Sequence, residues 1–392
     1  MGRVVWLVIP NSRHSTIMQL LLLQLAAGAA ASVTTPLVMM ADSFIKRGVP
    51  STINYSQMTL YMGFEAAYNL TGDVKYDDWH QEQIDQLVKS DGTIKDWDYD
   101  YYSLDDYRMG NNLLYWYAKT GETKYKEAAS IIRQQINRHP RTPAGGLWHR
   151  SPIYADQMWL DGIFMADSFY AKWTSVFDRD NETAWDDIAL QYANIEAHTR
   201  NKTTGLLRHG YDESKEAVWA DPETGSAPLV WDRAVGWYFL SLLEVLEVWP
   251  KTHAARGKLV GYLETLAVAL KKTQDESGGW WLIMSDPYPG AKGNYIESSG
   301  SAMFTYGFLK GIRQGLLSED EYLAAAQKAY EFLADEFVVD NGDGTVDWTG
   351  TVEVGSLNSN GTYEYYISVP LAVNDYKGAG PFMLASYEME ML

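Results

Sequence analysis

The strongest constraint on the fold of this chain is a short glycine-centred turn, followed by an aromatic residue or a histidine, that recurs along the sequence. Between the turns lie pairs of segments with apolar residues at helical spacing, such as 237–246 and 259–270. Self-similarity at a period of roughly 50 to 75 residues predicts a repeat of helical hairpins. The turns are Asp91–Trp97, Gly145–His149, Thr204–His209, Ser277–Trp281 and Asp343–Trp348.

A second cue separates the two helices of a pair. Thr71-Gly72 and Thr120-Gly121 each end one apolar segment and precede the next, and Asn181 and Ser318 stand before acidic helix starts. Counting these pairs gives about six hairpins. An open solenoid would end in polar capping repeats, whereas segment 380–386 is apolar. We therefore predict an all-α fold, an (α/α)6 barrel, with the glycine turns around one mouth.

Composition limits the organisation and the partners of the chain. Of its 392 residues 46% are hydrophobic, and we find no linker or low-complexity block, so we expect one catalytic domain over residues 32–392. The formal charge of −19 argues against nucleic acid and anionic membrane surfaces as partners. The absence of cysteine excludes disulfides, thiol catalysis and cysteine-ligated metal. The oligomeric state stays open.

The first residues resemble an export signal. Arg3 and Arg13 precede an apolar run, 18–31, that ends in small residues and is short for a membrane span. We expect residues 1–31 to be a removed secretion signal, and Met18 is an alternative start. The expected product is a secreted protein, and five Asn-x-Ser/Thr triplets are compatible with glycosylation. They begin at Asn54, Asn69, Asn181, Asn201 and Asn360.

The segment 146–162 holds the first candidate for chemistry. Asp161 follows Trp159 and Leu160 and precedes an apolar helical run. A carboxylate in such surroundings must be paired, hydrogen-bonded or protonated. Burial beside aromatic rings would raise the pKa of Asp161, as a general acid requires. The alternative is a core aspartate satisfied by backbone donors.

Two further clusters are expected at the same mouth. Trp231, Arg233 and Trp237 surround Gly236, and such residues can stack on sugar rings and bind a carboxylate. The alternative for Arg233 is a structural ion pair with Asp232 or Glu244.

Segment 102–110 supplies a second carboxylate, Asp105 or Asp106, either of which could instead be a helix N-cap. Paired carboxylates, tryptophans, one arginine and two histidines, His149 and His209, predict a carbohydrate site.

Metal and cofactor motifs are not expected to contribute. Segment 339–344 resembles the start of a calcium loop, but Val339 and Gly350 occupy positions where an EF-hand needs carboxylates. We interpret it as a turn. The sequence has no phosphate-binding glycine loop and no zinc helix, so we expect no metal and no cofactor.

Four motifs together resemble glycoside hydrolase family 105, the unsaturated rhamnogalacturonyl hydrolases. They are Trp148–Ala166, Trp231–Trp237, Glu297–Met303 and Asn374–Gly380. The resemblance implies an (α/α)6 barrel, the general acid/base at Asp161 and a second active-site aspartate at Asp105. It implies substrate contacts from His149, Trp159, His209, Trp231, Arg233 and Trp237. Ala155-Asp156 stands where the family pattern has Pro-His.

The resemblance also implies the reaction. The expected substrate is a small oligosaccharide with a 4,5-unsaturated uronic acid at its non-reducing end, left by a lyase acting on pectin, and the double bond would be hydrated. Two alternatives stay open. One is an unsaturated glucuronyl hydrolase acting on glycosaminoglycan, ulvan or arabinogalactan fragments, and the other is a secreted sugar-binding protein without turnover.

Overall fold

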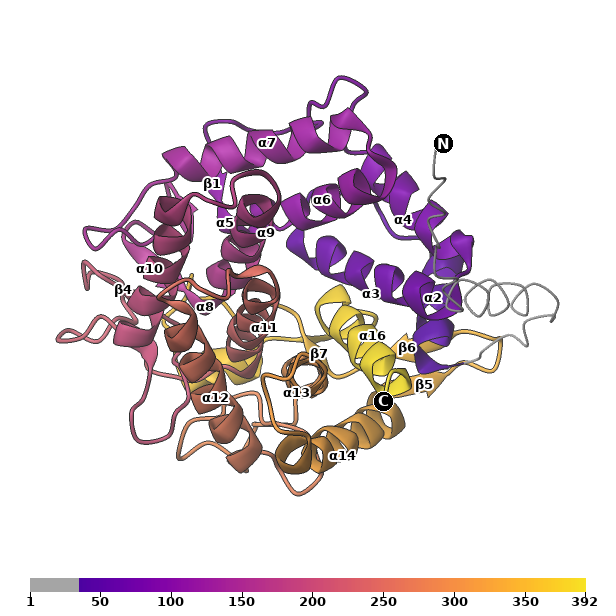
Figure 1. The fold of residues 1–392 in the computed structure, drawn as a ribbon. Coiled ribbons are helices and arrows are strands. Elements are labelled where there is room, and N and C mark those ends of the chain that lie inside the picture. Colours follow the sequence, from indigo (N-terminus) through magenta and orange to yellow (C-terminus); the bar gives the residue numbers. More distant parts are fainter. Residues whose placement is uncertain (1–34) are drawn as a thin grey trace, which may run out of the picture. The chain divides into compact units, whose positions relative to one another are not determined.

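The computed structural model describes residues 35–392, which form one compact unit. The predicted signal, residues 1–31, lies outside the described residues. Within them, twelve helices of ten residues or more pair into six hairpins around a central axis (Figure 1). The predicted (α/α)6 barrel is therefore confirmed. No helix in residues 35–392 is both long and apolar enough to cross a bilayer.

The helices form an inner ring and an outer ring that flanks it (Figure 1). The inner helices are α3 (Tyr55–Thr71), α6 (Met109–Thr120), α9 (Ser168–Phe177), α11 (Asp232–Val248), α13 (Ser298–Arg313) and α16 (Tyr376–Glu390). The outer helices are α4 (Val74–Asp85), α7 (Thr123–Arg138), α10 (Glu182–Thr199), α12 (Arg256–Lys272), α14 (Glu319–Phe337) and α2 (Pro36–Arg47). The first helix, α2, packs on the last, α16, and this contact closes the ring.

The two sequence cues mark the two ends of the barrel. Gly72 and Gly121 adopt left-handed conformations that cap α3 and α6, and they lead to the next outer helix. The five predicted turns all follow outer helices. Four of the turns are closed by an N–H that donates to the carbonyl four residues on, from Lys89 to Thr93, Thr142 to Gly146, Asp275 to Gly279 and Asn341 to Thr345. In the remaining turn the Asn201 N–H donates to the carbonyl of Leu206, five residues on. Each turn includes a glycine at positive φ, a conformation that side chains with a Cβ rarely adopt.

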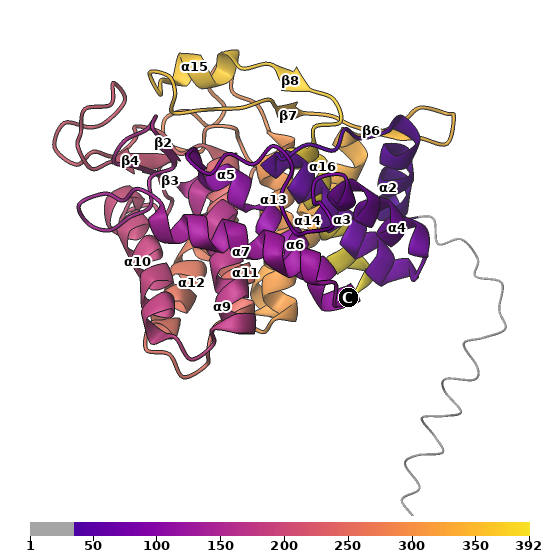
Figure 2. The same cartoon turned by 90° about the horizontal axis from the view of Figure 1, so that it is seen from above.

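Short strands and helices gather at the end of the barrel where the inner helices begin (Figure 2). The strand pairs are β1 (Tyr102–Ser103) with β2 (Arg150–Ser151), β3 (Gln157–Trp159) with β4 (Gly210–Asp212), β5 (Val338–Asp340) with β6 (Val346–Trp348) and β7 (Thr351–Val352) with β8 (Leu371–Ala372). The short helices are α5 (Leu104–Tyr107), α8 (Leu160–Gly162), the π-helix η1 (Ile163–Asp167) and α15 (Tyr363–Ser368). Segment 339–344 comprises the last two residues of β5 and the turn that leads to β6, so the predicted turn is present.

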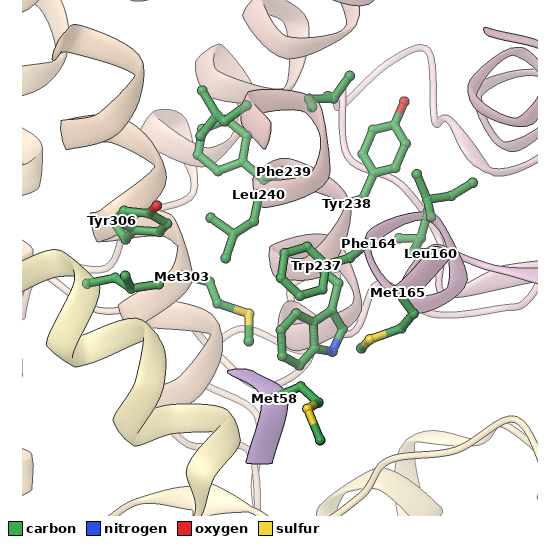
Figure 3. Packing of buried hydrophobic residues seen from close by; sticks show 14 of the residues in the cluster. Met58, Leu160, Phe164, Met165, Trp237, Tyr238, Phe239, Leu240, Met303 and Tyr306 are labelled. Carbon is green, nitrogen blue, oxygen red and sulfur yellow. The ribbon is translucent and has the colours of Figure 1, made fainter. Parts of the chain in front are cut away.

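An apolar layer fills the middle of the barrel. Trp237 lies among Phe164, Met58 and Met303 (Figure 3), and its ring stacks on Phe164 at a centroid distance of 4.8 Å. All four side chains are buried, and they separate the mouth from a polar cavity of about 290 Å³ at the far end. A buried ion pair between Arg108 and Glu244 lines that cavity. The lumen is thus polar at both ends and apolar between them.

Candidate active site

Two strand pairs bring the predicted site residues together. The β3–β4 pair joins Trp159 to Gly210, and the Leu160 N–H donates to the His209 carbonyl at 2.9 Å. Asp161 and His209 are therefore neighbours although 48 residues separate them. The β1–β2 pair acts in the same way, because the Leu104 N–H donates to the His149 carbonyl at 3.2 Å and places Asp105 beside His149.

Asp161 stands at the head of a hydrogen-bonded chain. Its Oδ2 lies 3.0 Å from Nε2 of His209, and Nδ1 of the same ring lies 2.6 Å from the hydroxyl of Tyr366 in α15. The side chains of His209 and Tyr366 are buried, whereas 15% of the Asp161 side chain is exposed. Asp161 is therefore the member of this chain that a ligand in the mouth can reach.

The structure corrects the expected electrostatics of Asp161. Burial raises the pKa of this carboxyl, as the sequence suggested, but the charge and hydrogen bond of His209 and the charge of His149 outweigh burial. The net shift of the Asp161 pKa is below its usual value. The reason is the β3–β4 pairing, which puts a histidine where the sequence indicated only aromatic and apolar neighbours.

Asp105, rather than Asp106, lies beside His149, whose charge acts on Asp161. Its Oδ2 accepts a hydrogen bond from Nη2 of Arg150 at 2.6 Å and lies 3.9 Å from Nε2 of His149. Ser103 occupies the N-cap position of α5, so Asp105 is not a cap. Asp106 lines a separate hollow, where burial and then the charge of Asp105 raise its pKa to about 7.

Aromatic rings cover one wall of the site. The ring of His149 stacks on Trp159 at 4.1 Å, and Tyr154 packs against the same tryptophan at 4.6 Å. Burial lowers the pKa of His149. Gly162 permits this arrangement, because a Cβ there would lie 2.6 Å from Leu104 and 3.3 Å from Nδ1 of His149.

Two predicted stacking residues have different positions from those expected. Trp231 and Trp237 are each only 1% exposed, so neither presents a free face to a sugar. Trp231 lies behind His209, with ring centroids 4.9 Å apart, and Trp237 belongs to the apolar layer. Both residues are therefore supports of the site in this structure rather than stacking platforms.

Arg233 is also a structural residue here. Its guanidinium donates to Ser299 Oγ at 3.0 Å and to the carbonyls of Val352 at 2.7 Å and Glu353 at 2.5 Å. The carboxylate of Glu297 lies 3.6 Å away, and both side chains are buried. The ion-pair partner is thus Glu297 rather than Asp232 or Glu244, and the expected contact of Arg233 with a uronate stays a prediction.

Four residues of the site were not predicted: Tyr55, Arg150, Tyr154 and Tyr366. Arg150 adjoins His149 in the sequence, and its side chain stays 26% exposed beside Asp105. Burial, and then the charge of Asp105, raise the pKa of Tyr55, with a smaller contribution from Asp161, so the charges of both carboxylates act on this phenol. Adjacency to a motif could have indicated Arg150, but no local signal points to Tyr366.

The fold and the paired carboxylates define a helical-barrel glycoside hydrolase, and comparisons with known proteins agree. The model of glycosyl hydrolase family 88 matches residues 39–392, so the chain belongs to this family. A family 105 glycoside hydrolase from C. acetobutylicum superposes with a TM-score of 0.87 at 38% identity, covering 92% of this chain and all of that one. The predicted resemblance to family 105 is confirmed.

Two curated relatives carry named activities. The unsaturated rhamnogalacturonyl hydrolase YesR of Bacillus subtilis is 26% identical over 281 residues, which cover 70% of this chain and 73% of that protein. An unsaturated 3S-rhamnoglycuronyl hydrolase of Formosa agariphila is 22% identical over 317 residues, covering 76% and 77%. This chain is therefore a glycoside hydrolase of the unsaturated uronyl hydrolase type.

Proposed function

We propose that this protein releases a 4,5-unsaturated uronic acid from the non-reducing end of lyase-generated rhamnogalacturonan oligosaccharides by hydrating the C4=C5 double bond. The observation that carries the proposal is the partly exposed Asp161, which is hydrogen-bonded to His209, with a second carboxylate, Asp105, near enough for the charges of both to act on Tyr55. Hydration of an enol ether needs one group that gives a proton and takes one back, and a carboxyl can do both. The pKa of Asp161 is lowered in the free protein, and the negative charge of a bound uronate would raise it toward the donor form.

The reaction would begin at the double bond. Asp161 delivers a proton to C4, which leaves an oxocarbenium-like cation at C5. Water adds to C5 and returns a proton to Asp161. The resulting hemiketal opens to a ketone, and the hemiacetal formed at C1 expels the neighbouring sugar. Asp105, beside His149 and Arg150, orients the water or the sugar hydroxyls.

Arg150 is the cation that the geometry favours for the substrate carboxylate. Its side chain is partly exposed at the mouth, whereas the guanidinium of Arg233 is enclosed by carbonyls. Asp105 holds Arg150 through one nitrogen, Nη2. A guanidinium offers five N–H donors, so it can bind a second carboxylate.

The rhamnogalacturonan substrate is favoured over a glucuronyl substrate by the activity named for the Bacillus subtilis relative. The activity named for the Formosa agariphila relative keeps a rhamnose-linked glucuronyl substrate as the alternative. We further propose that the protein acts outside the cell, on the basis of the basic and apolar order of residues 1–31.

The test is to incubate the purified protein with unsaturated galacturonyl-rhamnose, with unsaturated glucuronyl-rhamnose and with the saturated galacturonyl disaccharide. The proposal expects ultraviolet absorbance to fall fastest with the first and no sugar release from the third. Faster turnover of the glucuronyl substrate would transfer the assignment to the alternative. Release from the saturated disaccharide would contradict hydration.

A further inference from the structure

We propose that the polar cavity at the far end of the barrel is a second binding site, which takes a compact zwitterion carrying one ammonium and one carboxylate, such as a small amino acid. The apolar layer around Trp237 separates this cavity from the mouth, so the inference goes beyond the proposed function and does not depend on it. The cavity volume of about 290 Å³ is at the lower end of the range of about 300 to 1,000 Å³ that small-molecule sites occupy. A ligand for it must therefore be small.

Most of the charged groups in the cavity wall already have a partner. Three ion pairs account for six of them: Arg108 with Glu244 at 2.8 Å, Lys310 with Glu247 at 3.0 Å and Arg313 with Glu388 at 2.5 Å. The other two charged residues of the wall are Glu65 in α3 and Lys172 in α9, and neither forms an ion pair within residues 35–392. Acidic and basic side chains line the cavity in equal number, so it does not favour an ion of one sign.

Glu65 and Lys172 act on each other across the cavity. After burial, the charge of Lys172 is the largest influence on the pKa of Glu65, and it lowers that pKa. Helix α6 lies between α3 and α9 in the inner ring (Figure 1), so the two side chains approach the lumen from different sides. The space between them suits a ligand whose ammonium binds Glu65 and whose carboxylate binds Lys172.

Polar atoms without partners support the same orientation. Ser168 precedes Lys172 by one turn of α9, on the same face, and its Oγ has no hydrogen-bond partner among the described residues. Nδ2 of Asn112 donates to Glu65 at 3.4 Å, and Oδ1 of the same amide has no partner in residues 35–392. Buried polar atoms are nearly always hydrogen-bonded. A hydroxyl donor thus accompanies the cation, and an amide acceptor accompanies the carboxylate.

This distribution of groups distinguishes a zwitterion from other small ligands. A simple carboxylate would pair with Lys172 and leave Glu65 without a cation, and a simple amine would do the reverse. A neutral sugar would supply neither charge. Entry is possible from the far end, because the side chains of Glu247 and Arg313 at the rim are 53% and 46% exposed.

The first experiment is calorimetric titration of the whole protein at pH 8 and low salt. Glu65 is ionised there, because its pKa is about 7. Glycine, β-alanine and 4-aminobutyrate are titrated, each beside the carboxylic acid and the amine of the same chain length. We expect one of the three amino acids to bind about 10- to 100-fold more tightly than either of its single-charge analogues, because each analogue loses one charge-assisted contact.

The second experiment locates the binding by substitution. Glu65→Gln and Lys172→Met should each weaken binding of that amino acid at least about 10-fold. The matched control is Lys272→Met, which removes the same charge from the exposed end of the outer helix α12 and should bind as wild type does. Thermal unfolding of each variant shows whether it is folded.

Two results would overturn the proposal. One is a wild-type protein that binds none of the three amino acids, or binds them no more tightly than their single-charge analogues. The other is unchanged affinity in both Glu65→Gln and Lys172→Met. The wild-type titrations decide the ligand class even if a variant fails to fold, and they do so whether or not the protein turns over an unsaturated uronide.

Discussion

Two arginines approach the carboxylates of the mouth, and their surroundings give them different tasks. Arg150 is partly exposed and holds Asp105 through one nitrogen. Arg233 is enclosed by Ser299, two backbone carbonyls and Glu297. Sequence reasoning chose Arg233 because tryptophans flank it. The carbonyl of Val352 that satisfies it lies 119 residues away, which no local pattern reveals.

Arg150→Met should weaken substrate binding. Loss of a charge-assisted contact to the uronate should raise KM about 10- to 100-fold, with little change in the midpoint of thermal unfolding. Arg150→Lys keeps the charge but lacks the planar guanidinium, so its KM should lie between those of wild type and Arg150→Met. Steady-state kinetics on unsaturated galacturonyl-rhamnose measure this. An unchanged KM in Arg150→Met would remove Arg150 from the substrate site.

Arg233→Met should instead destabilise the fold. It leaves the fully buried Glu297 without its cation, and breaking such a pair costs about 3 to 5 kcal/mol of unfolding free energy. Urea unfolding followed by fluorescence checks this. Adding Glu297→Gln should recover part of the loss. A variant as stable as wild type but with a raised KM would restore the uronate-binding role that the sequence suggested.

At the scale of elements, the glycine turns were predictable and the strand pairs were not. The turns need a positive φ and a hydrogen bond between residues close in the sequence. Because glycine adopts a positive φ without strain, the glycines in the sequence indicate where such turns occur. Strands β1 to β4 have only two or three residues each, too few for an alternating pattern. These strands nevertheless place Asp105 beside His149 and Asp161 beside His209.

The loop 150–157 contains the backbone strain of the site. Tyr154 has a φ of 61° and Asp156 a φ of 55°, and a bulky residue such as tyrosine rarely adopts this region. The loop also includes Ala155-Asp156, where the sequence departs from the family pattern. Backbone strain in a loop beside the candidate site is a reason to expect a function for the Tyr154 side chain.

Tyr154→Gly should separate stability from binding. Glycine relieves a strain of about 1 to 3 kcal/mol, which offsets the loss of the contact with Trp159. We expect unfolding free energy within about 1 kcal/mol of wild type, and a raised KM for the disaccharide. Urea unfolding measures the free energy of unfolding, and steady-state kinetics on the same preparation measure KM. An unchanged KM would show that the Tyr154 ring does not contribute to the substrate site.

At the scale of the molecule, the ring closes through α2 and α16, which lie at opposite ends of the described chain. The apolar C-terminal segment predicted closure, because an open end would need a polar cap. The polar cavity at the far end of the lumen was not predicted. The residues that line this cavity come from the six inner helices. Because each helix contributes only a few of them, no single segment of the sequence indicates the cavity.

Glu65 makes that cavity pH-sensitive. Burial raises its pKa to about 7, against a usual value of 4.5. Between these values the folded state holds a proton that the unfolded state has lost, so Glu65 lowers stability progressively as pH rises and by a constant amount above 7. The stability of Glu65→Gln relative to wild type should therefore be about 3 kcal/mol greater at pH 8 than at pH 4.5. Urea unfolding at both pH values measures this, and a pH-independent difference would contradict it.

The central claim is that Asp161 gives the proton that starts hydration of the double bond. The most direct test follows ultraviolet absorbance of unsaturated galacturonyl-rhamnose with wild type, Asp161→Asn and the control Asp156→Asn, which alters a nearby aspartate outside the Asp161–His209 chain. We expect loss of absorbance with wild type and Asp156→Asn, and a rate at least about 100-fold lower with Asp161→Asn. Equal loss of absorbance with Asp161→Asn would contradict it and place the acid elsewhere.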